Sequence, residues 1–169
     1  MQKDSILNII LVGVGLCIVC GAVISTVAVS LRDQQEQNVI FDQQSKIIDA
    51  ARLLEVYPSS QEALDSIEEV VVNLNDGQPS GFPPEQYDLD SILRDSSQHT
   101  VLNGSDDIAM ISVRENLSKV YIEYRNNELK TLILPVRGYG LWGTLYGYLA
   151  LDSDLNTIVG LEFYKHKET

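Results

Sequence analysis

Residues 6–31 carry no charged side chain, and this one run limits the possible folds more than any other feature of the chain. Charged residues bound it closely, with Lys3 before it and Arg32 directly after it. About 20 consecutive apolar residues are enough to cross the hydrocarbon core of a bilayer as one helix. We therefore predict that residues 1–32 form a transmembrane anchor.

A cleaved signal peptide is the alternative interpretation of the same run. The small residues Ala28-Val29-Ser30 suit a cleavage site, but the apolar stretch is too long for a usual signal peptide and the residues before it are barely positive. The flanking charges nearly balance, with Lys3 and the terminal amine on one side and Arg32 on the other. Charge alone therefore does not decide the membrane orientation.

Both cysteines of the chain, Cys17 and Cys20, lie inside the apolar run. The remaining residues therefore have no disulfide framework. We interpret the two thiols as ordinary small residues of a membrane helix, and a metal cluster shared with another subunit as the alternative, because such a cluster needs further ligands. The net charge of −12 argues against a nucleic-acid partner, which requires clustered Lys and Arg.

A polar segment with an apolar stripe at helical spacing follows the anchor. This pattern predicts an amphipathic linker helix over residues 33–57, which Pro58 ends. Ser59 and Glu62 have the spacing of a capping box, which predicts a second, short helix to about Glu69. Residues 58–169 are then expected to form one domain.

That domain alternates β-like runs with turn signals. We predict a long loop over residues 78–104 with one helical turn near residues 89–93, and a two-residue hairpin turn at Asn126-Asn127. The β-like runs are residues 70–74, 107–113, 119–125, 128–136, 145–151 and 158–164. A single N-terminal helix followed by these runs predicts an α+β fold with an antiparallel sheet.

The sequence offers no catalytic constellation and no metal-binding set, so we assign neither kind of residue. Common hydrolase and P-loop motifs are absent. Residues 138–143 nearly imitate the glycine fingerprint of dinucleotide-binding folds, but a strand-like run follows them where that fold requires a helix. The nucleotide-binding interpretation is therefore rejected for this motif.

The most specific motifs lie at the end of the chain. They are Arg137-Gly138-x-Gly140-Leu141-Trp142, then Leu145-Tyr146-Gly147-Tyr148-Leu149-Ala150-Leu151, Asp154-Leu155-Asn156-Thr157 and Phe163-Tyr164-x-His166-x-Glu168-Thr169. This stretch resembles the C subunit of the bacterial sodium-pumping NADH:quinone oxidoreductase, an FMN-binding domain family. The resemblance extends to the anchor and the helix after it, and it is weak between about residues 58 and 107.

The resemblance implies a flavoprotein subunit that relays electrons through FMN, in a membrane complex that transfers electrons from NADH to ubiquinone and exports Na⁺. The expected partners are the other subunits and the membrane, and the expected location is the bacterial inner membrane with the soluble domain on the periplasmic side. In the family, FMN is bound covalently to a Thr in a Ser-Gly-Ala-Thr-like motif, which these residues lack. We therefore expect the attachment Thr to lie beyond this chain, which would be a C-terminally truncated part of the domain.

Four residues are candidates for cofactor binding. The resemblance implies that Leu141 and Trp142 form an apolar wall for the flavin ring, and that Glu168 and Thr169 open a segment that approaches it. Such a ring needs apolar or aromatic walls and polar groups at its edge. The alternative is that Trp142 is a core residue and that the glycines only form a turn.

Two other functions remain as alternatives. The first is the G subunit of the related ferredoxin-dependent ion-pumping electron-transport complex, which shares the plan of an anchor followed by an FMN-binding domain. The Arg137-to-Trp142 motif and the long helical linker favour the C subunit of the NADH:quinone oxidoreductase. The second alternative is a non-redox, membrane-anchored binding or scaffold module.

Overall fold

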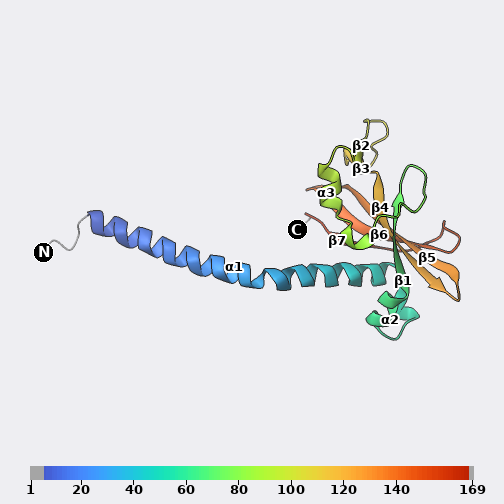
Figure 1. Ribbon diagram of the computed structural model, residues 1–169, viewed down its shortest axis with the longest axis horizontal. Helices are drawn as coiled ribbons and strands as arrows, with labels where there is room; N and C mark the ends of the chain where they lie inside the picture. The colour runs from blue at the N-terminus through green and yellow to red at the C-terminus, as the bar shows by residue number, and fades with distance from the viewer. Residues whose placement is uncertain (1–5, 168–169) are drawn as a thin grey trace. The chain divides into compact units, whose positions relative to one another are not determined.

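The computed structural model describes residues 6–167 and has the α+β architecture expected from the sequence. Its contacts divide the chain into two compact units, Met1–Phe41 and Asp42–Thr169. Figure 1 shows the order of the elements along the chain, with one long N-terminal helix followed by the sheet.

Helix α1 (Ile6–Ala50) contains the apolar run and is long and apolar enough to cross a membrane. Two hydroxyl groups of the run, those of Thr26 and Ser30, bond to backbone carbonyls of the helix itself. Thr26 Oγ1 donates to the carbonyl of Ala22 at 2.8 Å, and Ser30 Oγ donates to the carbonyl of Val27 at 2.9 Å. These bonds matter because lipid offers no partner for a polar group.

The predicted end of the linker helix was wrong. Helix α1 ends at Ala50, seven residues before Tyr57, and Arg52 takes a left-handed backbone with φ of 52° before the short helix η1 (Leu53–Glu55). The reversal places Leu53 in the core, where its side chain is 1% exposed. Burying this side chain stabilises the domain more than a further helical turn would, so the chain leaves the helix early.

The capped second helix is confirmed, but it is shorter than predicted. Helix α2 (Ser60–Asp65) begins after Ser59, whose side chain accepts a hydrogen bond from the backbone N–H of Glu62 at 3.3 Å. Strand β1 (Ile67–Asn73) takes over the residues that we assigned to the end of the helix. Pairing of β1 with a neighbouring strand outweighs the weaker local preference for helix.

Five strands form one antiparallel sheet in the order β1-β4-β5-β6-β7. The four further strands are β4 (Leu117–Arg125), β5 (Glu128–Tyr139), β6 (Thr144–Asp152) and β7 (Ile158–Lys165). Asn126 and Asn127 join β4 to β5 with φ values of 52° and 64°. Two consecutive left-handed residues make the tight hairpin turn that the Asn-Asn pair predicted.

The region between β1 and β4 contains the short helices η2 (Pro84–Gln86) and α3 (Leu89–Arg94), and α3 confirms the predicted helical turn. The predicted strand over residues 107–113 was wrong, because only Val113 belongs to a strand. It begins β3 (Val113–Glu115), which pairs with β2 (His99–Val101). Asp107 organises the intervening turn by accepting from the backbone N–H of Ile111 and Ser112 at 2.8 and 2.7 Å.

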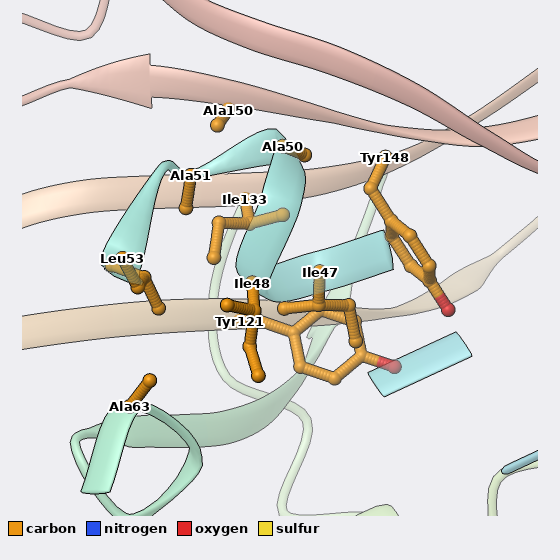
Figure 2. Packing of buried hydrophobic residues seen from close by; sticks show 10 residues of the cluster. All are labelled: Ile47, Ile48, Ala50, Ala51, Leu53, Ala63, Tyr121, Ile133, Tyr148 and Ala150. Carbon is orange, nitrogen blue, oxygen red and sulfur yellow. The ribbon is translucent and has the colours of Figure 1, made fainter. Parts of the chain in front are cut away.

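The core lies on one face of the sheet, beneath the last two turns of α1, η1 and α2 (Figure 2). Across the strands Tyr121, Ile133 and Ala150 stand side by side, since Tyr121 pairs with Ile133 and Ile133 with Ala150. Gly160 continues this row on β7 opposite Ala150. Ala50 packs directly on Gly160, so the helix end approaches the sheet at a position without a side chain.

Candidate functional site

The Leu141-Trp142 pair lies at the tip of the β5–β6 hairpin. Tyr139 pairs with Thr144, and the backbone N–H of Gly140 donates to the carbonyl of Gly143 at 2.8 Å, which closes the turn. Leu141 is 79% exposed and Trp142 is 67% exposed. The alternative in which Trp142 is a core residue is therefore excluded, and the pair forms an apolar surface at this end of the sheet.

The segment that follows β7 passes beside the same turn. Lys165 pairs with Tyr146, and the side chain of Lys167 packs on Gly143 so closely that a Cβ added there would lie 2.5 Å from Lys167 Cδ. Glu168 and Thr169 lie outside the described residues, so their contact with a cofactor stays a prediction. Lys167 nevertheless brings the chain to the turn immediately before those two positions.

A pocket of about 220 Å³ opens on the helix-covered face of the same end of the sheet. Tyrosine rings form much of its wall. Tyr148 and Tyr164 are stacked with their centroids 4.8 Å apart, Tyr121 meets Tyr148 edge-on at 5.6 Å, and Tyr146 lies 6.2 Å from Tyr164. Such contacts stabilise the rings and keep the wall rigid.

Burial keeps these tyrosines in their neutral form. It raises the pKa of Tyr87 to about 12, with a smaller contribution from the nearby carboxylate of Glu115. Burial also raises the pKa of Tyr121, Tyr148 and Tyr164 above the usual value for a phenol. At neutral pH the pocket therefore presents aromatic surface and hydroxyl groups, and it contains no phenolate base.

An almost buried ion pair supports the wall of the pocket from β5 and β3. Arg137 Nη2 donates to Glu115 Oε2 at 2.7 Å and to the carbonyl of Val113 at 2.6 Å, and the two charged side chains are 9% and 11% exposed. Within the described part of the chain, Arg137 Nε has no hydrogen-bond partner. The pair holds β3 against the glycine-rich end of β5, because separating two buried charges is costly.

The sequence pattern contains Arg137 only as part of a motif and indicates neither its partner nor the pocket. Glu115 lies 22 residues before Arg137, and no local pattern links the two. The alternation of Tyr146 and Tyr148 along one strand was the available signal for the aromatic wall, since every second residue of a strand faces the same side.

The groups around this end of the sheet are suited to binding and offer little for acid–base catalysis. Lys119 Nζ lies 5.4 Å from the centre of the Tyr121 ring, and Lys165 Nζ lies 5.1 Å from that of Tyr146. Among residues 6–167, no group of three or more His, Cys, Asp or Glu side chains is placed to hold a metal ion. Apolar surface and aromatic rings are what a flat ring system requires of a binding site.

The chain is similar over nearly its whole length to proteins named as the C subunit of Na(+)-translocating NADH-quinone reductase. It is 40% identical to the one from Pseudomonas aeruginosa, covering 99% of this chain and 66% of that protein. The proteins from Vibrio vulnificus and Vibrio campbellii are 36% and 34% identical, with 66% and 67% of their lengths covered. The chain thus spans about two thirds of the length of these relatives.

A solved structure has the same fold. The crystal structure of Shewanella oneidensis NqrC superposes with a TM-score of 0.65 at 27% sequence identity, over 75% of this chain and 59% of that one. No family model matches the chain.

Proposed function

Because the chain belongs to the family of C subunits of Na(+)-translocating NADH-quinone reductase, we propose that it forms the anchor and much of the FMN-binding domain of such a protein. The complex would pass electrons from NADH to ubiquinone and export sodium ions, with the other subunits as partners. FMN would supply the one-electron chemistry, and this chain would position it.

The observation that carries the proposal is the exposed Leu141-Trp142 pair beside Lys167. These two apolar side chains are 79% and 67% exposed, and cover by a flat ring would remove that surface from water. Gly143 allows Lys167, which follows β7, to pack close to the turn. The residues present therefore fit one side of a flavin site, as the resemblance implied.

Covalent flavin is the test of this function. A chimera would join this chain to the part of the Pseudomonas aeruginosa relative that it does not match, and would be produced with a flavin-attaching enzyme. We expect a yellow protein whose flavin absorption stays with the polypeptide after denaturation. A colourless chimera, made under conditions that load the complete relative, would support the scaffold alternative instead.

The relatives named above are all C subunits of the NADH-quinone reductase, which favours that family over the G subunit of the ferredoxin-dependent complex.

Trp142→Leu is expected to weaken the contact with the flavin. Loss of one aromatic stacking partner costs about 1 kcal/mol, or about fivefold in affinity. Titration of free FMN into the unloaded chimera, followed by quenching of flavin fluorescence, would measure the change. Tyr124→Leu is the matched control, because Tyr124 is a 43% exposed aromatic residue near the opposite end of the β4–β5–β6 hairpins. Equal affinities for the two variants would remove Trp142 from the site.

Two arginines inside the apolar run are expected to prevent stable membrane insertion. Each Arg near the centre of a membrane helix costs about 2.5–3.5 kcal/mol, so Val14→Arg with Ile18→Arg should move most of the protein out of the membrane fraction. Gln34→Arg with Gln37→Arg adds the same charge outside the run and should leave the protein in the membrane. Retention of the first variant would require a second anchor.

Protease accessibility of the control in spheroplasts would test the proposed periplasmic location.

A further inference from the structure

The last part of the β5–β6 hairpin has no neighbouring strand on either side. Within the described residues, β4 pairs with β5 only as far toward the turn as Ile133, and β7 pairs with β6 only as far as Tyr146. Residues 138–145 therefore form a two-stranded ribbon, which ends in the turn that carries Leu141 and Trp142. Such a ribbon is only marginally stable by itself. An ordered turn at its tip requires support from outside the hairpin.

The segment 109–115, which lies before β4 in the chain, supplies support along the free edge of β5. The backbone N–H of Tyr139 donates to the carbonyl of Ala109 at 2.8 Å. Ala109 also lies against Gly138, since a Cβ added to this glycine would be 3.7 Å from the carbonyl oxygen of Ala109 and 3.8 Å from its Cβ. The segment therefore contacts the ribbon directly, through one hydrogen bond and through close packing.

The charged contact comes from Arg137, immediately before the ribbon begins. Its Nη2 donates to the carbonyl of Val113 at 2.6 Å and to Glu115 Oε2 at 2.7 Å. The side chains of Arg137 and Glu115 are 9% and 11% exposed, so water screens their attraction only weakly. Separating them would leave two uncompensated charges inside the protein, which is costly. The pair therefore ties the end of β5 to the segment 109–115.

The supporting segment is itself held in one conformation. Met110 and Ser112 have φ values of 52° and 64°, in the left-handed region that residues other than glycine rarely adopt. The carboxylate of Asp107 compensates by accepting hydrogen bonds from the backbone N–H groups of Ile111 and Ser112 at 2.8 and 2.7 Å. This bent backbone brings both Ala109 and the following strand β3 to the end of β5, so the segment acts as a rigid support.

We propose that Arg137 is a positioning residue for the flavin site. Its buried bonds hold the hairpin against the segment 109–115 and thereby keep Leu141 and Trp142 in one orientation. Arg137 acts through the turn in this role. The consequence for flavin binding rests on the proposed function, whereas the order of the turn is measured without a flavin.

Time-resolved fluorescence anisotropy of Trp142, the only Trp of the chain, measures this order in the full chain in detergent micelles. The test variant is Arg137→Met with Glu115→Gln, which removes the donor without leaving an unpaired buried charge. We expect a larger amplitude of nanosecond depolarisation, because the turn gains freedom relative to the sheet. Arg137→Lys should keep most of the wild-type behaviour, because both bonds of Arg137 leave one nitrogen and an ammonium group has three donors.

Arg125→Met with Glu123→Gln is the matched control. It removes another Arg–Glu pair, which lies at the opposite end of β5, where Arg125 pairs with Glu128. We expect lower stability but wild-type anisotropy, which separates positioning of the turn from a general loss of stability. Each variant is measured well below its own thermal midpoint. If the test variant does not fold, Glu115→Gln alone replaces it, with a smaller rise in depolarisation expected. Anisotropy equal to that of the wild type would overturn the proposal.

Titration of free FMN into the unloaded chimera tests the role toward the flavin. The test variant should lose up to about the fivefold in affinity expected for Trp142→Leu. Combining the two should cost little more than Trp142→Leu alone, because both act through the same contact. Full additivity, or wild-type affinity of the test variant where Trp142→Leu weakens binding, would contradict a positioning role. If Trp142→Leu has no effect, the proposed flavin wall fails, and the anisotropy alone decides whether Arg137 orders the turn.

Discussion

Replacement of Glu123 by Ala is expected to lower the free energy of unfolding by about 3–4 kcal/mol. The carboxylate is fully buried at 0% exposure, and three side chains donate to it. Tyr57 donates at 2.9 Å, Thr131 at 2.8 Å and Arg125 Nε at 2.6 Å. Without the acceptor, two of these donors lose their partner inside the core, while Arg125 can turn to water because it is 40% exposed.

Denaturant unfolding of the full chain, followed by circular dichroism, would measure this loss. Glu128→Ala is the control, because Glu128 pairs with Lys130 at 2.8 Å but is 72% exposed. Exposed ion pairs contribute at most about 1 kcal/mol. A Glu123 variant no less stable than the Glu128 variant would show that the buried network contributes little.

The same carboxylate makes stability depend on pH. Burial opposes its ionisation, but the hydrogen bonds from Arg125, Thr131 and Tyr57 outweigh burial and hold the pKa of Glu123 below the usual 4.5. A group with a lowered pKa in the folded state binds its proton more readily when unfolded. Its contribution is therefore complete above about pH 4.5 and is lost as pH falls toward the lower, folded value. Glu123→Gln should flatten the unfolding curve in that range.

Gly160→Val is expected to destabilise the domain by about 3 kcal/mol. A Cβ at this position would press on the carbonyl oxygen and carbon of Ala50, which are backbone atoms and cannot rotate away. The end of α1 would have to move off the sheet, and the core side chains Ile47 and Ala50 would lose contacts with Ile133 and Ala150 (Figure 2).

Gly104→Val is the matched change, because the space around Gly104 is open and a Cβ there would meet nothing within 4 Å. Its thermal midpoint should stay close to that of the wild type, while the midpoint of Gly160→Val falls by several degrees. Similar midpoints for the two variants would mean that the helix end is not held against β7 as tightly as the core packing indicates.

Local sequence patterns were sufficient for the features that depend on a few neighbouring residues. The charge-free run predicted the long helix, Ser59 predicted the cap of α2, and Asn126-Asn127 predicted a turn that needs two left-handed residues. The motif from Arg137 to Trp142 also led to the correct family. In each case the backbone or side-chain preference that causes the feature acts within one helical turn or one hairpin. The pattern therefore predicts the feature without knowledge of distant contacts.

Contacts between distant residues decided the rest. Leu53 reaches the core only if α1 ends at Ala50, and Arg137 finds Glu115 only because β3 lies beside β5. The sequence around Leu53 or Arg137 does not indicate these contacts. The benefit of burial or of a buried ion pair depends on which side chains the whole fold brings together. For the same reason, strand alternation divides the residues between two faces, but only the folded sheet shows which face the described residues bury in a core.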